Sequence, residues 1–201
     1  MVPLIIVIVI VVLVLLALWA AFNGLVKKRN RTQEAWSEID VELKRRHDLI
    51  PNLVQTVQGY ATHEQSTFEA VTQARANAVS AGATGDPQKI GQAENALSGT
   101  LRSLFAVAEN YPQLKASELF LNLQEQLTNT EDKVEFSRRF YNGNVRDFNT
   151  ALQTFPTNIY GQIMHFQPFA FFQVADAERA APTVSFPSAP TVPPPAAAPP
   201  V

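Results

Sequence analysis

The stretch His63-Glu64-Gln65-Ser66-Thr67 comes nearest to an enzymatic motif in this sequence. Zinc proteases of the zincin type need two histidines four residues apart on one helical face, with a glutamate as the general base. Thr67 stands where the second histidine would be, so the motif is incomplete. The alternative is a metal site assembled from distant residues such as His47, Asp48 and His63, which do not have metal-ligand spacing.

The remaining motifs of common enzymes are missing from the sequence. It contains no glycine-rich phosphate loop, no nucleophile elbow and no Cys-x-x-Cys pair. The paired carboxylates of Glu131-Asp132 have charged neighbours, which indicates a solvated helix face. We therefore expect a protein that is not an enzyme and that uses neither a metal nor a cofactor.

A basic cluster, Lys44-Arg45-Arg46-His47-Asp48, is the best candidate for binding a partner. Its first three residues spread over about 200° of a helix, so they cannot share one narrow face. One interpretation is solvated charge with local i,i+4 ion pairs. In the other, arginines bind carboxylates of a partner or phosphates of lipid, and neighbouring polar groups orient them. The candidate partner-binding residues are Arg45, Arg46, His47, Asp48 and Asn52.

The element that must position everything else is an unbroken apolar run from Val2 to Phe22. Roughly 21 residues at about 1.5 Å each cross a hydrocarbon core of about 30 Å as one helix. A cleaved signal peptide would need a basic start, a shorter core and a small-residue cleavage site. A buried core helix rarely runs this long without a polar residue. We predict an uncleaved anchor, with Trp19 and Phe22 at the membrane interface.

The charges beside the anchor predict its orientation. Lys27, Lys28, Arg29 and Arg31 follow the apolar run, and basic residues are retained on the cytoplasmic side. This predicts a single-pass protein of the cytoplasmic (inner) membrane, with its N-terminus outside and its C-terminal domain in the cytoplasm. Seven of the 16 basic residues lie between positions 27 and 46, and the chain beyond is acidic. That distribution suits anionic membrane lipid as a partner and does not suit nucleic acid.

Helical periodicity continues into the soluble part. Apolar residues recur at steps of mostly three or four between Thr32 and about Ala81, which predicts helix. Since no proline lies between Pro3 and Pro51, the anchor is expected to run into the first soluble helix as one rod, with Asn23-Gly24 as a flex point. Pro51 predicts a break or kink near Leu49-Ile50.

Two further helices are predicted by their end signals. After a loop at positions 82–85, Asp86-Pro87 is typical of an N-cap followed by a first-turn proline, and this helix should end near Tyr111-Pro112. A three–four alternation from Phe120 to Leu152 covers nearly five heptads and predicts a long packed helix that stops at Pro156. A short aromatic segment should then fill the core against this bundle; it contains Phe166, Phe169, Phe171 and Phe172.

The sequence therefore divides into three parts. Residues 1–26 form the transmembrane anchor, residues 27–179 the helical bundle, and residues 180–201 a Pro/Ala-rich tail whose composition favours disorder over a packed core. The tail matches the PxxP spacing, as prolinic segments often do by chance. The predicted fold class is all-α, with a single N-terminal transmembrane helix followed by an elongated antiparallel bundle of long helices.

A series of short motifs runs through the chain in order. It comprises Arg29-Asn30-Arg31, Glu34–Val41, Leu43–Val54, Gly59-Tyr60-Ala61, His63-Glu64, Ala74-Arg75, Ala108–Pro112, Leu114-Lys115, Leu123-Gln124, Thr130-Glu131, Arg138–Asn142 and Phe155-Pro156. The series closely resembles the bacterial LemA family over about residues 1 to 187. The resemblance implies a single-pass membrane protein with a bundle of long antiparallel helices, and it implies no defined reaction. Some members are associated with membrane zinc proteases of the HtpX type, and one takes part in building magnetosome membranes.

These observations lead to one main functional hypothesis and two alternatives. The main hypothesis is a non-enzymatic helical scaffold or adaptor at the membrane that associates with copies of itself, because an elongated bundle offers long faces to its neighbours. The alternatives are an accessory or regulator of a membrane metalloprotease, and a protein that shapes membranes.

Overall fold

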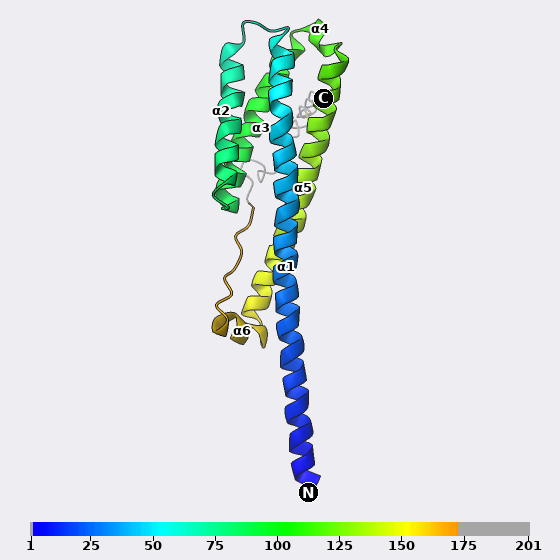
Figure 1. Ribbon diagram of the computed structural model, residues 1–201, viewed down its shortest axis with the longest axis vertical. Coiled ribbons are helices and arrows are strands. Elements are labelled where there is room, and N and C mark those ends of the chain that lie inside the picture. The colour runs from blue at the N-terminus through cyan, green and yellow to red at the C-terminus, as the bar shows by residue number, and fades with distance from the viewer. Residues whose placement is uncertain (1, 173–201) are drawn as a thin grey trace, which may run out of the picture.

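The computed structural model describes residues 2–172, which form six helices and no strand. The helices are α1 (Val2–Gln58), α2 (Gln65–Gly82), α3 (Pro87–Glu109), α4 (Pro112–Lys115), α5 (Glu118–Gln153) and α6 (Thr157–Ile163). Figure 1 shows them as an elongated bundle from which the N-terminal part of α1 projects alone. The all-α prediction is confirmed for this range. The predicted disorder of residues 180–201, and the end of the predicted bundle at 173–179, lie outside it.

Helix α1 is the rod that the sequence predicts. Its 57 residues correspond to about 85 Å of helix at about 1.5 Å per residue, and it continues without interruption through Asn23-Gly24. Among residues 2–172 it is the one helix that is long and apolar enough to cross a membrane. Its apolar run is exposed along almost its whole length. An exposed apolar run of this length matches a helix that faces lipid, so α1 is both the membrane anchor and the first helix of the bundle.

Of the predicted break or kink near Leu49-Ile50, the break is wrong, because α1 passes through Pro51 and ends at Gln58. Proline has no backbone N–H, so Pro51 cannot donate to the carbonyl oxygen of His47 four residues earlier. Arg75 of α2 takes over this role, and its Nε donates to the His47 oxygen at 2.7 Å. A tertiary contact therefore satisfies the carbonyl that proline leaves unpaired.

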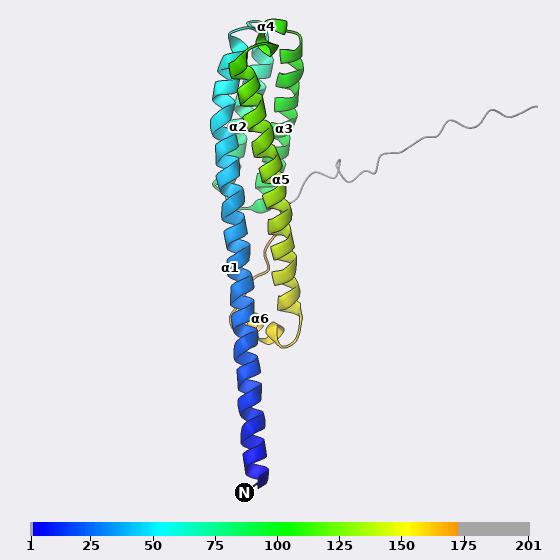
Figure 2. The same cartoon turned by 90° about the vertical axis from the view of Figure 1, so that its right-hand side faces the viewer.

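The bundle has two layers. Helices α1 and α5 run antiparallel and side by side, and α2 and α3 form a helical hairpin on one side of this pair (Figures 1 and 2). The predicted start of α3 is confirmed, because the Asp86 side chain accepts a hydrogen bond from the Gln88 backbone N–H and Pro87 is the first helical residue. The preceding loop contains Gly85 at φ 65°, a conformation that glycine adopts without steric cost.

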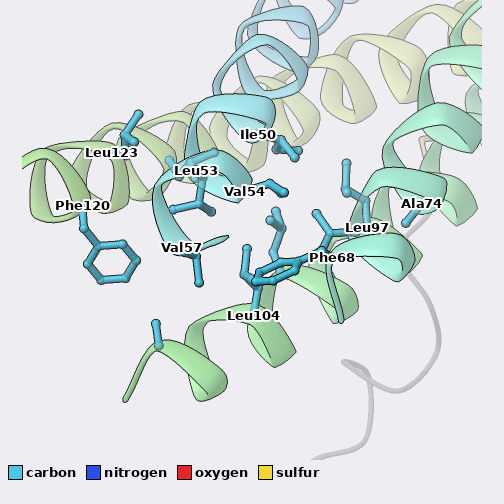
Figure 3. Close-up of a cluster of buried hydrophobic side chains, with 14 of the residues drawn as sticks. Ile50, Leu53, Val54, Val57, Phe68, Ala74, Leu97, Leu104, Phe120 and Leu123 are labelled. Atoms are coloured by element: carbon cyan, nitrogen blue, oxygen red, sulfur yellow. The ribbon is translucent and has the colours of Figure 1, made fainter. Parts of the chain in front are cut away.

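Two apolar clusters hold the layers together. The cluster farther from the N-terminal apolar run, called the upper cluster, joins α1 to α2, α3 and α5. Figure 3 shows its side chains converging. Its large members include Ile50, Leu53, Val57, Phe68, Leu97, Leu104, Phe120 and Leu123. The lower cluster joins α1 and α5 to the start of α3 and to the aromatic segment after α6; it contains Ala35, Ile39, Leu43, Ile90, Val134, Tyr141, Val145 and Phe172. The ionisable residues described next, Arg46 and His47 on α1, Glu94 on α3 and Glu131 on α5, lie between these two clusters along their helices.

Candidate functional site

A buried ion pair lies in the middle of the bundle. Arg46 on α1 places Nη1 3.2 Å from Oε2 of Glu94 on α3, and only 3% of Arg46 and 4% of Glu94 is exposed. The neighbouring His47 places Nε2 2.6 Å from the other carboxylate oxygen of Glu94. Both oxygens of the buried carboxylate therefore have a partner on α1. Breaking such a pair from one side leaves an uncompensated buried charge.

The same arginine extends the network to a third helix. Arg46 Nη2 lies 2.7 Å from Ser98 Oγ on α3 and 2.7 Å from Glu131 Oε2 on α5, whose side chain is half exposed. These residues line a small cavity of about 230 Å³, which also has Arg102 and Phe105 in its wall. The network thus joins α1, α3 and α5 at one level of the bundle.

The position of the network explains what it does for the fold. On α1 it follows Leu43 of the lower cluster and precedes Ile50 of the upper one, and on α3 Glu94 falls between Ile90 and Leu97. Apolar clusters can slide by one helical turn at small cost, whereas a buried charge must meet its partner. We interpret the ion pair as the feature that specifies the register of α1 against α3.

The arrangement does not contain the usual elements of a catalytic site. The Glu94 carboxylate is enclosed and fully engaged by Arg46 and His47, whereas a general base must reach a substrate. Within residues 2–172, no group of three His, Asp or Glu side chains is placed to hold a metal ion.

The structure divides the five predicted partner-binding residues between two environments. Arg45, Asp48 and Asn52 are exposed on α1, whereas Arg46 and His47 point into the bundle and are engaged by Glu94. The five therefore do not form one surface. Binding of a partner through the exposed three stays a prediction. Glu42 stands four residues before Arg46, at the spacing of a local i,i+4 ion pair, but Arg46 instead pairs with Glu94 and Glu131, which are far away in sequence.

His63 lies in the turn between α1 and α2, outside any helix, and its side chain is exposed. Thr67 lies in the first turn of α2, so the two positions of the incomplete zincin motif do not share a helical face. His47, whose Nε2 contacts Glu94, is buried in the network described above.

The predicted interface residues lie where the apolar run meets the bundle. Trp19 is exposed, and the ring of Phe22 packs against Tyr160 of α6 with 5.7 Å between centroids. The basic side chains Lys27, Lys28, Arg29 and Arg31 are all exposed on α1. The guanidinium of Arg29 lies 5.4 Å from the centre of the Phe166 ring, a cation–π contact.

The aromatic segment after α6 is held by side chains that the sequence analysis did not single out. Asn149 and Asn142 on α5 each exchange two hydrogen bonds with a backbone group of this segment, at Phe169 and Phe172 respectively, with distances of 2.9–3.0 Å. The two asparagines are seven residues apart, which places them on one face of a helix. The seven-residue spacing of the two asparagines is the signal in the sequence from which this attachment could have been predicted. The segment contains no regular secondary structure, so the asparagine amides replace the backbone partners that a sheet would supply.

Tyr141 strengthens this attachment. Its hydroxyl donates to the carbonyl oxygen of Ala170 at 2.9 Å, and its ring packs against Trp36 at 5.2 Å. Burial raises the pKa of Tyr141 to about 12, because the phenolate would lose its hydration. The predicted core-filling role is confirmed for Phe172, which is buried in the lower cluster, while Phe166 and Phe169 are half-buried and pack on Phe148. Phe171 is the exception, because it is exposed.

A shallow groove of about 570 Å³ runs between α1 and α5. All its lining residues come from these two helices, and they are Ser37, Glu38, Val41, Glu42, Asn129, Asp132, Lys133, Phe136 and Ser137. The large apolar side chains of Val41 and Phe136 are exposed at its edge. We call this surface the α1/α5 groove.

The fold and these sites define a class of protein. A single apolar helix continues directly into an antiparallel helical bundle, and the described polar network is internal to that bundle. This is a membrane-anchored helical-bundle protein.

Comparison with known proteins gives the family. The model of the LemA family matches residues 35–186. A Protein LemA of Metamycoplasma hominis is 30% identical over 159 residues, covering 78% of this chain and 71% of that protein. Magnetosome protein MamQ 1 of Paramagnetospirillum magneticum is 25% identical over 175 residues, covering 76% of this chain and 64% of its own length. Magnetosome protein MamQ of Magnetospirillum gryphiswaldense is also 25% identical, over 174 residues, 75% of this chain and 64% of that protein. The chain belongs to the LemA family.

Proposed function

We propose that this protein is a non-enzymatic scaffold or adaptor of the cytoplasmic membrane that associates with copies of itself. The observation that carries the proposal is the α1/α5 groove, where Val41 and Phe136 expose apolar surface between the two longest helices of the bundle. Exposed apolar side chains gathered at one surface are typical of sites where proteins meet.

Membrane anchoring favours a second copy as the occupant of this groove. Copies inserted in one membrane share the same orientation, so the same residues stand at the same height above the bilayer. A twofold axis along the membrane normal would bring Phe136 of one copy against the groove of the other. Lys133, whose Nζ lies 3.9 Å from Glu42 Oε1 within one copy, lines the groove together with the acidic Glu38 and Asp132, so opposite charges can face each other across such an axis.

Cysteine crosslinking tests this arrangement, because the natural chain contains no cysteine. We expect Phe136→Cys to form a disulfide-linked dimer when membranes holding the full-length protein are oxidised. The matched control is Lys89→Cys, which places an exposed thiol on α3, away from the groove. Addition of Val41→Asp should reduce the Phe136 crosslink severalfold. If both thiols remain monomeric and the solubilised chain runs as a monomer, the proposal of self-association is wrong.

The orientation belongs to the same proposal. The exposed collar of Lys27, Lys28, Arg29 and Arg31 supports a cytoplasmic bundle, since basic residues beside a single anchor are retained inside. In intact cells, the thiol of Lys89→Cys should react with a membrane-permeant maleimide and stay unreactive toward an impermeant one. Labelling by the impermeant reagent would place the bundle outside.

Absence of catalysis is also a proposal, and metal analysis tests it. We expect the purified full-length protein to contain no stoichiometric zinc, and His63→Ala to leave its metal content unchanged. Stoichiometric zinc that is lost on His63→Ala would favour a hydrolase with its own metal site. Copurification of a membrane protease with the metal-free protein would favour the accessory role.

Membrane shaping is the second candidate, and the similarity to magnetosome proteins supports it. A rigid rod beside a basic collar could crowd or bend anionic lipid. Full-length protein in vesicles that contain anionic lipid should then produce tubules, and Lys27→Gln/Lys28→Gln should reduce them. Vesicles that stay spherical at high protein density would remove this candidate.

A further inference from the structure

The end of the bundle nearest the anchor carries an apolar surface that the core does not use. Phe155 is 79% exposed and Ile163 66% exposed, and Ile159 and Met164 are exposed beside them. These four residues follow α5 or belong to α6 and its end, and we call them the foot. Because all four side chains are exposed, packing in the core does not require them to be apolar. Apolar residues gathered at one surface indicate contact with something other than water.

The foot lies at the level where the membrane anchor ends. Tyr160 of α6 packs on Phe22, the last residue of the apolar run, and Leu25 is buried at the same junction. Figures 1 and 2 both show α6 at the end of the bundle, beside the point where α1 leaves it. Since α1 is continuous, its insertion in the bilayer fixes the height of α6 at the membrane surface.

The composition around the foot agrees with this depth. From Phe148 to Phe172 the sequence contains no Asp, Glu, Lys or Arg. Charged side chains are costly below the headgroups, whereas apolar and aromatic ones are favoured at the boundary between headgroups and acyl chains. The basic residues that would meet lipid phosphates lie instead on α1, further from the apolar run, at Lys27, Lys28 and Arg29.

We propose that the foot inserts into the surface of the same leaflet from which α1 emerges, with a lipid bilayer as its partner. The bundle then has a second membrane contact besides its anchor. Two contacts restrict the tilt of the rod, which a single helix does not. The foot is attached on both sides, because Tyr160 of α6 contacts Phe22 of the rod and the asparagines of α5 hold the segment that follows α6.

Depth-dependent quenching in bilayers tests the proposal on the full-length chain. A single thiol at Ile163→Cys carries an environment-sensitive fluorophore, and the protein is reconstituted in phosphatidylcholine/phosphatidylglycerol vesicles with or without lipids that bear a nitroxide near the headgroup. We expect a blue-shifted emission and quenching at least about threefold stronger than for the same label at Lys89→Cys on α3, as for a residue at the headgroup boundary. Aqueous iodide should quench the Ile163 label less than the Lys89 label.

A variant of the foot tests whether the quenching at Ile163→Cys depends on the neighbouring apolar side chains. Phe155→Ser/Ile159→Ser changes exposed side chains, and should leave the helical signal and the Lys89 reporter unchanged while weakening nitroxide quenching at Ile163→Cys. Iodide quenching at Ile163 as strong as at Lys89 would overturn the proposal, because the foot would face water. A label shielded from iodide and unquenched by nitroxide lipid, together with a disulfide between copies when the unlabelled Ile163→Cys protein is oxidised, would also overturn it, because the foot would then contact protein. Neither result depends on the α1/α5 groove.

Discussion

Replacement of Arg75 by methionine should destabilise the bundle, and the size of the loss should depend on residue 51. The Arg75 Nε donates to the His47 carbonyl oxygen at 2.7 Å, and Pro51 cannot supply the backbone N–H that this oxygen would meet in an ordinary helix. Methionine keeps most of the apolar stem of the arginine and removes the guanidinium, with its charge and its donors.

The expected loss of unfolding free energy depends on whether the His47 carbonyl oxygen still has a hydrogen-bond donor. With Pro51 present, Arg75→Met leaves the His47 oxygen without a partner, and a lost hydrogen bond to a charged group costs about 1.5–3 kcal/mol. In a Pro51→Ala background the alanine N–H can donate to the same oxygen, so Arg75→Met should then cost less than about 1 kcal/mol. The coupling between the two positions should therefore be about 1–2 kcal/mol.

Urea unfolding of the full-length protein in detergent micelles measures the four free energies of this cycle. The chain has two tryptophans, and in a Trp19→Phe background Trp36 alone reports on the bundle, because its ring packs against Tyr141 and Phe172. Arg102→Met is the matched control, since Arg102 is exposed on α3, and it should shift the midpoint little.

Additive effects of Arg75→Met and Pro51→Ala, within about 0.5 kcal/mol, would refute the reasoning. The carbonyl of His47 would then be satisfied in some other way, and the passage of α1 through Pro51 would need another explanation. A cost of Arg75→Met no larger than that of Arg102→Met would have the same consequence.

Three other substitutions test the remaining contacts by the same unfolding measurement. Arg46→Met leaves the buried Glu94 carboxylate unpaired and should cost about 3–5 kcal/mol, whereas Arg45→Met, one residue away and exposed, should cost less than about 0.5 kcal/mol; equal losses would contradict the buried network. Asn149→Ala removes both bonds to the Phe169 backbone and should cost about 1–3 kcal/mol, with increased proteolysis of the chain after α6. The pKa of Tyr141 is raised from 10.0 to about 12, so its protonated form contributes stability that is complete below pH 10 and is lost as the pH rises through about 12. Tyr141→Phe should abolish that part of the pH dependence, and an unchanged alkaline profile would argue against burial as the cause.

The sequence predicted most of the elements correctly because their signals are local. Hydropathy marks the anchor, the three–four alternation marks α5, and Asp86-Pro87 marks the start of α3. Each signal depends on residues within one or two turns of each other, so no knowledge of the partner helix is needed.

The failures concern residues whose partners lie far along the chain. Pro51 was expected to break or kink the helix, because nothing nearby in sequence satisfies the His47 carbonyl. Arg46 was expected on the surface, because Glu42 four residues earlier, or a partner's carboxylate, could meet its guanidinium there. The partners are Arg75 and Glu94, which lie 28 and 48 residues away. Propensity and charge patterns contain no information about contacts across such separations.

By itself, then, the sequence determined that this chain has one membrane anchor, long amphipathic helices and no complete catalytic motif, because those properties follow from composition and periodicity. Tertiary structure decided which polar groups are internal and which remain available. The physical reason is burial. The charge of Arg46 is enclosed between two apolar clusters and must be paired within the fold, whereas Arg45, one position away, remains in solvent. For this protein, the candidate sites of contact are therefore not Arg46 and His47 but exposed apolar surfaces such as the α1/α5 groove and the foot.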